Sequence, residues 1–243
     1  MEAENLPTFN SNAIEVNLHK IPDLSDKFVY FNDDFFILRK TEPSHFFRRG
    51  LPAGVASLNA FSPVSDDTFH YSANCVSAVN RNFDKRATLR RHFSKWFNPR
   101  YGSHLFRTIA LSPWPRFTGF AQLHLPQPFL RSTFEEVWER EPQALTETAK
   151  SRLRSLSNVS QYVFQYWQLC SGQFTPVSPR RYGRYWEIGR DAFADILKGI
   201  VSQEDSLVCI NDGPVESFAD AKRDLQAAFL TLFPSHSKFE LQS

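Results

Sequence analysis

Two predicted strands end in polar side chains that can bind metal ions or phosphate groups. The strands are the apolar runs 28–31 and 207–210, and the polar residues that follow them are Asn32, Asp33, Asp34, Asn211 and Asp212. Ligands of open α/β sheets bind beyond the carboxyl ends of the strands. Carboxylates at such an edge can hold a divalent cation, which would neutralise phosphate oxygens of a substrate. The alternative is that these residues form turns and cap the following helices.

One histidine and two arginines could complete such a site. His124 stands in Leu-His-Leu-Pro, where an imidazole can act as a general base or nucleophile. Arg152 and Arg154 flank Leu153, and a guanidinium matches phosphate oxygens in two-point geometry, as a nucleotide-sugar substrate would require. Taken singly, His124 also fits a hydrogen-bonded structural residue, and the arginines fit the solvated end of a helix.

Positive charge is concentrated in residues 81–107, which hold eight Lys and Arg residues against the single Asp84. Aromatic residues are interleaved with these charges, among them Phe83, Phe93, Trp96, Phe97 and Tyr101. The stretch can bind nucleic acid, an anionic polysaccharide or a lipid-linked acceptor, or it can be a helix with a basic outer face and an aromatic inner face. Since the net charge of the chain is only +2, the plain helix or a phosphate-bearing acceptor is favoured over DNA.

The elements that must position these residues alternate between helices and strands. In the first half of the chain, a capping box of Asn12 and Glu15 predicts a short helix, and the run 28–31 predicts a strand buried on both faces. Residues 50–70 indicate an irregular connection, and residues 72–96 a basic helical region.

The second half predicts further helices around one more strand. Four prolines exclude a regular helix from residues 112–128, and Thr133 with Glu136 forms a second capping box. Residues 158–170 predict an aromatic-rich helix, and a long helix is expected between Pro214 and Pro234. The fold class expected is α/β, with an open, mostly parallel Rossmann-like sheet flanked by helices and a helical insertion, in a single unit.

Several protein classes are excluded by composition and by missing motifs. The chain has 42% hydrophobic and 22% charged residues, which is typical of a packed globular protein. The start of the chain does not fit a signal peptide, and no apolar run is long enough to cross a bilayer, so we expect a cytoplasmic protein. Cys75, Cys170 and Cys209 show no paired metal-ligand spacing, and the motifs of P-loop NTPases, serine hydrolases and zincins are missing.

The sequence resembles the Stealth family of sugar-phosphate transferases in three ordered blocks. The second family block is similar to Leu6-Pro-Thr-Phe-Asn-Ser11, Ala13-Ile-Glu15, Leu18-His-Lys-Ile-Pro22 and Phe28-Val-Tyr-Phe-Asn-Asp-Asp34. The third resembles His124-Leu-Pro126 through Ser151-Arg-Leu-Arg-Ser155. The fourth resembles Val208-Cys-Ile-Asn-Asp212 through Phe233-Pro234 and Ser237-Lys-Phe-Glu240. This places the blocks in regions of about 5–110, 120–172 and 205–243 of one catalytic domain spanning 1–243.

The resemblance implies transfer of a hexose-1-phosphate from a nucleotide sugar, typically UDP-linked, to a hydroxyl of an acceptor glycan. It implies Mg²⁺ or Mn²⁺ as cofactor, with Asp34 and Asp212 as ligands, and peripheral association with capsule machinery at the inner face of the membrane. The implied catalytic residues are Asp34, His124, Arg154 and Asp212. The implied substrate-binding residues are Asn32, Asp33, Arg152 and Asn211.

The first family block, a strand with an Ile-Asp-x-Val-Tyr-Thr-Trp-Val-Asp type motif, has no counterpart in the sequence. We therefore expect residues 1–243 alone to bind a cation and nucleotide weakly, with little transfer. The alternative function is a truncated, non-catalytic glycan- or nucleotide-binding remnant of the same family.

Overall fold

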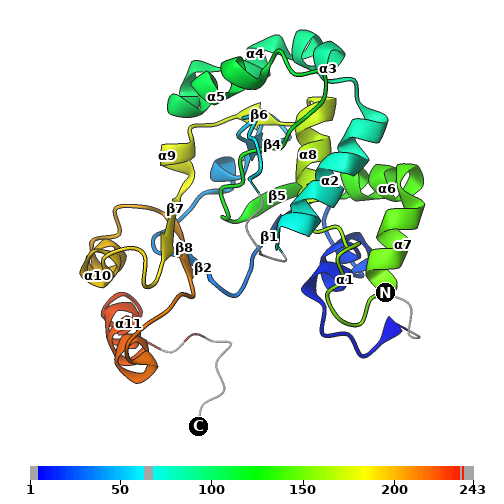
Figure 1. Ribbon diagram of the computed structural model, residues 1–243. Coiled ribbons are helices and arrows are strands. Elements are labelled where there is room, and N and C mark those ends of the chain that lie inside the picture. The colour runs from blue at the N-terminus through cyan, green and yellow to red at the C-terminus, as the bar shows by residue number, and fades with distance from the viewer. Residues whose placement is uncertain (1–4, 63–67, 236, 238–243) are drawn as a thin grey trace. The chain divides into compact units, whose positions relative to one another are not determined.

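The computed structural model describes residues 5–62, 68–235 and 237, and these form two compact units (Figure 1). The first unit consists of Met1–Tyr30, Pro43–Gln122 and Gln127–Pro179, and the second of Phe31–Glu42, Leu123–Pro126 and Arg180–Ser243. Each unit is thus assembled from segments far apart in sequence. The single catalytic domain expected across the chain stays a prediction. Residues 63–67 of the expected connection and 238–240 of the fourth block lie outside the described residues.

The first unit is mainly helical. Its α-helices are α1 (Ser11–Glu15), α2 (Thr68–Asn82), α3 (Lys85–Arg91), α4 (Phe93–Trp96), α5 (Ser103–Leu111), α6 (Arg131–Arg140), α7 (Pro142–Lys150) and α8 (Tyr162–Ser171). Its 3-10 helices are Leu18–Lys20, Pro43–His45 and Pro99–Tyr101. Its strands are β1 (Lys27–Tyr30), β3 (Phe47–Arg48), β4 (Leu51–Gly54), β5 (Gln127–Leu130) and β6 (Thr175–Pro176). The pair β1-β5 is antiparallel, and the other three strands have the order β3-β4-β6.

The aromatic-rich helix predicted at 158–170 is confirmed as α8, which lies in the core of the first unit. Phe164 of α8 stacks on Phe134 of α6, with 3.6 Å between the ring centroids. Tyr166 stacks on Phe120 at 4.3 Å, and both are fully buried. Large aromatic rings therefore supply much of the buried apolar area that holds this unit together.

The second unit is a small sheet covered on one face by two helices. The strand order is β2-β8-β7, and the bounds are β2 (Phe35–Ile37), β7 (Arg184–Glu187) and β8 (Leu207–Asn211). Strand β8 is antiparallel to β2 and parallel to β7. The helices are α10 (Phe193–Ser202) and α11 (Phe218–Leu232), and the short α9 (Pro179–Tyr182) precedes β7. Leu38, Val208 and Ile210 pack in a core with both helices, which leaves the alternate strand residues for the opposite face.

Both capping boxes are placed wrongly by the sequence. Helix α1 is capped by Asn10, whose side chain accepts from the amide of Asn12, and Glu15 is its last residue. Helix α6 begins at Arg131 directly after β5 and has no side-chain cap, so Thr133 lies inside the helix. A strand that runs straight into a helix leaves no separate residue for the capping position.

Two predictions about strands also need correction. The run 28–31 becomes β1, which is exposed or half-buried rather than buried on both faces, because it pairs only with β5. Residues 50–70 are not wholly irregular, since β4 pairs with β3 and β6. The strand at 207–210 and the long helix before Pro234 are confirmed as β8 and α11.

The mixture of helices and strands expected from the sequence is confirmed. The open, mostly parallel Rossmann-like sheet is not found among the described residues, whose strands form three small sheets with both parallel and antiparallel pairs. In the described part of the chain, no helix is both long and apolar enough to span a membrane.

Candidate active site

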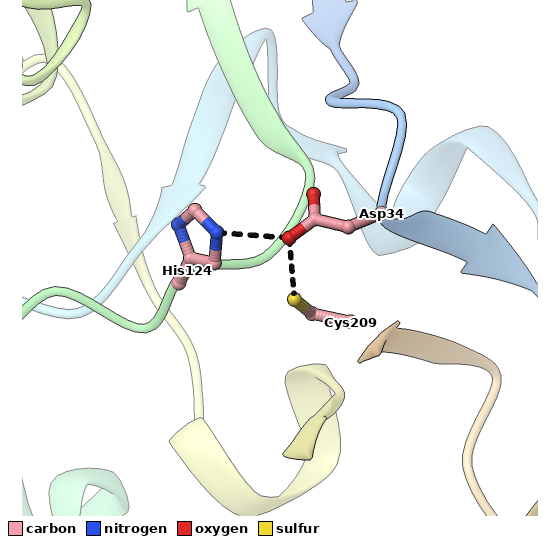
Figure 2. Close-up of side chains that lie close together, drawn as sticks. All are labelled: Asp34, His124 and Cys209. Carbon is pink, nitrogen blue, oxygen red and sulfur yellow. Dashed lines mark hydrogen bonds and ion pairs between the residues drawn. The ribbon is translucent and has the colours of Figure 1, made fainter. Parts of the chain in front are cut away.

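Three side chains from distant parts of the sequence meet in the second unit (Figure 2). The Oδ2 oxygen of Asp34 lies 3.1 Å from Nε2 of His124 and accepts a hydrogen bond of 3.1 Å from the Cys209 thiol. The side chains of Asp34 and His124 are 20% and 31% exposed, so both can meet a ligand. Cys209 is fully buried beneath them.

Asp34 is positioned by a turn and by the register of β2. The amide of Phe35 donates to the carbonyl of Asn32 at 3.2 Å, which closes a tight turn over Asp33 and Asp34. The Asp34 carbonyl accepts from the Ile210 amide at 2.9 Å, and Phe35 pairs with Cys209. This register brings the Asp34 carboxylate to the Cys209 thiol.

His124 is held in an unusual backbone conformation. Its φ is 46°, in the left-handed region that non-glycine residues rarely adopt. The segment that follows is fixed by the buried Leu125 and by the Tyr182 hydroxyl, which donates to the Pro126 carbonyl at 2.5 Å. The imidazole meets the rings of Phe35 and Tyr185 edge-on, with centroid distances of 5.2 and 5.8 Å. Strained residues of this kind cluster at functional sites.

Burial and the carboxylate determine the ionisation of neighbouring groups. Burial, with the Asp34 hydrogen bond and charge, raises the pKa of the Cys209 thiol well above its usual range. Burial and the nearby Glu187 raise the pKa of Tyr185 to about 12. At neutral pH Cys209 is therefore a protonated donor to Asp34 and not a nucleophilic thiolate.

The other carboxylate oxygen of Asp34 is the clearest sign of a ligand. Oδ1 is buried and has no hydrogen-bond partner among the described residues. An unsatisfied buried oxygen is costly, and a bound cation or donor would remove that cost.

The same cluster has the groups needed to coordinate a metal ion. One ligand atom each of Asp34, His124 and Cys209 lies within 4.8 Å of the others. Mg²⁺ prefers oxygen and commonly binds through one or two carboxylates together with substrate phosphates. The free Oδ1 of Asp34 fits that role, whereas the protonated thiol of Cys209 does not.

The remaining acidic and amide residues predicted for the site occupy different positions. Asn32 begins the turn, and Asp33 lies exposed on it. Asn211 ends β8 opposite Glu187 and, two residues after Cys209, belongs to the same face of the sheet.

Asp212 lines a cavity of about 780 Å³ with Phe36 and residues of α11, on the face where Val208 and Ile210 pack. The described residues that form the possible ligand set with Asp34 do not include Asp212. Their shared binding of one metal stays a prediction.

Arg152 and Arg154 lie in the first unit, on an exposed loop between α7 and α8. Nη2 of Arg154 donates to the Ser11 hydroxyl at 3.3 Å. The loop is anchored by the buried Asn10, whose Nδ2 donates to the Ser151 carbonyl at 3.0 Å and to Oδ1 of Asn158 at 2.8 Å. The association of either arginine with His124 stays a prediction.

Sequence reasoning missed Cys209, Tyr185 and the Asn10–Asn158 anchor. Cys209 could have been found from its spacing, because it lies two residues before Asn211 in a strand. Tyr185 depends on the parallel pairing of β7 with β8, and Asn10 on a contact with a loop over a hundred residues away, for which no local pattern exists.

The chain is similar to one protein family and to several named relatives. Residues 1–53 match the family model described as Stealth protein CR2, conserved region 2, and this range includes Asp34. The chain is 40% identical over 243 residues to the exopolysaccharide phosphotransferase cps2G of Lactiplantibacillus plantarum, covering 99% of this chain and 71% of that protein. It is 37% identical over 241 residues to the capsular polysaccharide phosphotransferase WcwK of Streptococcus pneumoniae, with the same coverage. It is 35% identical over 240 residues to the receptor polysaccharide phosphotransferase WefC of Streptococcus gordonii, covering 97% of this chain and 71% of that protein.

The chain is therefore an enzyme of the phosphotransferase class. It belongs to the Stealth family.

Proposed function

We propose that this enzyme transfers a hexose-1-phosphate from a nucleotide sugar, UDP-linked in the simplest case, to a hydroxyl of an acceptor glycan during capsular or exopolysaccharide synthesis. The names of the relatives support a polysaccharide context. The observation that carries the chemistry is the Asp34–His124 pair, with a buried Asp34 oxygen left for a ligand. The reaction would take place in the cytoplasm at the inner face of the membrane.

The reaction exchanges one phosphate bond for another. The acceptor hydroxyl oxygen forms a bond to the phosphorus that carries the hexose, and the phosphoanhydride bond to the nucleoside monophosphate breaks. The hydroxyl proton passes to a base, and the nucleoside monophosphate leaves with the bonding electron pair. Such chemistry depends mostly on positioning and on neutralising charge.

His124 is the residue placed to accept the proton. If Nε2 carries the hydrogen that faces Asp34, then Nδ1 is the basic nitrogen of the ring. Asp34 would hold this tautomer and stabilise the imidazolium that forms, as a carboxylate does beside a catalytic histidine. The same imidazole could instead attack phosphorus first as a nucleophile, in which case a phosphohistidine would be trapped when the acceptor is omitted.

The charges of the phosphates need partners. Mg²⁺ or Mn²⁺, when bound, would neutralise phosphate oxygens, and Oδ1 of Asp34 with the carboxylate of Asp212 would hold it. Arg152 and Arg154 would bind phosphate oxygens, while Asn32, Asp33 and Asn211 would contact the donor or acceptor.

The test is release of nucleoside monophosphate by the purified chain, given UDP-sugars, Mg²⁺ or Mn²⁺ and a capsule oligosaccharide. Because the first family block has no counterpart in residues 1–243, we expect acceptor-dependent release to be slow, and to fall at least about a hundredfold further in Asp34→Asn. Asp195→Asn, an exposed acid in the first turn of α10, serves as the matched control and should keep full turnover.

Equal turnover by Asp34→Asn and wild type would overturn the proposed site. Nucleotide binding without turnover by the wild type, even with every donor and acceptor tried, would instead support the non-catalytic remnant.

A further inference from the structure

Four large apolar side chains stand exposed on consecutive elements of the first unit. Phe93 on α4 is 62% exposed, Phe106 and Ile109 on α5 are 75% and 50% exposed, and Trp114 after α5 is 54% exposed. Single exposed apolar residues are common, but four within so short a stretch form an unusual surface. The sequence had favoured an inner face for the aromatic residues of this region. Trp96 and Tyr101 are buried as expected, whereas Phe93 is exposed.

The way helix α5 packs on the first unit leaves its apolar residues Phe106 and Ile109 on the solvent side. Thr108 is fully buried, and its Oγ1 accepts a hydrogen bond of 3.1 Å from the Leu58 amide, which places Thr108 on the inner face of the helix. Phe106 and Ile109, three residues apart, therefore share the outer face. The exposure of these two side chains thus follows from the packing of the helix.

Two lysines, the buried Lys85 and the half-buried Lys95, hold this region together. Nζ of Lys85, at the start of α3, donates to the carbonyls of Leu111 at 2.6 Å and Trp114 at 2.9 Å, which ties the end of α5 to α3. Nζ of Lys95 donates to the carbonyls of Gly172 and Phe174. Figure 1 shows α3, α4 and α5 following one another along one edge of the first unit.

The other cations of this region are exposed. Residues 85–116 contain no Asp or Glu, so the positive charge has no acidic neighbour within the segment. The exposed guanidinium groups belong to Arg86, Arg90, Arg91, Arg100, Arg107 and Arg116. The four apolar residues and these six arginines are called the α3–α5 face below.

We propose that the α3–α5 face docks on an anionic lipid bilayer. Aromatic and aliphatic side chains would enter the interfacial layer, and the arginines would bind lipid phosphates, as in peripheral proteins that lie on a membrane surface. Nucleic acid would use the same charges and stack on aromatic rings, but it gives no reason to expose Ile109 beside Phe106. The face belongs to the first unit, whereas Asp34, His124 and Cys209 belong to the second, and docking does not depend on the proposed transfer.

The test is co-flotation of the whole chain with vesicles, measured without sugar substrates. One set of vesicles is phosphatidylcholine alone, and the other contains an equal part of phosphatidylglycerol. We expect binding only to the anionic set, weakened about tenfold by Phe106→Ser through loss of apolar burial and about fivefold by Arg90→Gln through loss of one charge. Phe218→Ser on α11, which removes a phenylalanine that is 72% exposed, is the matched control and should bind as wild type.

Insertion has its own readout. Lipids brominated in the acyl chain should quench tryptophan fluorescence of the wild type, and Trp114→Phe should lose that quenching. Equal binding by Phe106→Ser and wild type, or no quenching of bound protein, would overturn the proposal in favour of a purely electrostatic surface. Tighter binding to a single-stranded oligonucleotide than to anionic vesicles would assign the face to nucleic acid instead.

Discussion

Two carboxylates of the second family block show opposite uses of a buried oxygen. Glu15 is 6% exposed, and both of its oxygens are engaged, Oε1 by the Tyr30 hydroxyl at 3.0 Å and Oε2 by the Gln161 amide at 3.2 Å. In Asp34, by contrast, His124 and Cys209 both contact Oδ2, and Oδ1 has no hydrogen bond in the described structure. A carboxylate with both oxygens occupied by protein groups holds the fold, whereas one that leaves an oxygen is prepared for a ligand.

The largest effect expected from this comparison is on His124. His124→Ala removes the proposed base and should lower transfer about a thousandfold, since general acid–base catalysis contributes that order of rate. The melting temperature should not fall, because the imidazole is part-exposed and its removal leaves no cavity in the core. His70→Ala on α2 is the matched control for turnover. If His124→Ala kept full activity, the Asp34–His124 pair would have no role in catalysis, and the contrast with Glu15 would no longer hold.

The next effect is on stability and concerns Glu15. Glu15→Ala leaves the buried Gln161 amide without its acceptor, so we expect a loss of about 2–3 kcal/mol in the free energy of unfolding, measured with urea. Glu139→Ala, an exposed residue of α6, should change it little. If Glu15→Ala instead abolished turnover and left stability unchanged, Glu15 would belong to the chemistry.

A smaller effect sharpens the same contrast through pH. Burial raises the pKa of Glu15 above its ordinary value of 4.5 despite its hydrogen bonds and the nearby Arg154. The folded state therefore holds the proton more tightly than the unfolded state, and this contribution is complete below 4.5 and lost as the pH rises through the folded pKa.

Wild type should consequently lose stability relative to Glu15→Gln as the pH rises above 4.5. The measurement is the difference in unfolding free energy between the two proteins at each pH. A constant difference would show that Glu15 does not titrate differently on folding.

The smallest effect is expected at Cys209. Cys209→Ala removes one weak donor to Oδ2 and should slow transfer about threefold to tenfold, whereas Cys209→Ser keeps a donor and should stay closer to wild type. Because the pKa of the thiol is raised, iodoacetamide should not label Cys209 in the folded protein at neutral pH. Rapid labelling would place a thiolate beside Asp34 and change its role.

Local patterns predicted the elements better than their partners. The apolar runs that became β1 and β8 and the helices α8 and α11 follow from side-chain periodicity, which is a property of neighbouring residues. The pairing of β1 with β5, and of β2 with β8, depends on contacts between distant segments. The apolar runs alone therefore could not predict how the strands are arranged in sheets.

The site divides in the same way. Asp34 and His124 were found as chemical types at suitable places, and the structure brings their side chains within 3.1 Å of one another. The cleft that they were expected to share with Asp212 stays a prediction. The hydrogen bond from Cys209 to Asp34 and the free Oδ1 of Asp34 could not be predicted, because each depends on the register between β2 and β8.

The left-handed backbone of His124 has a consequence for protein engineering. Glycine adopts this conformation without the steric cost that an imidazole-bearing residue must accept. A laboratory selection for thermal stability alone would thus favour His124→Gly, and we expect the more stable variants to have lost turnover. Screens on this scaffold should hold position 124 fixed, because thermal tolerance and turnover select opposite residues there.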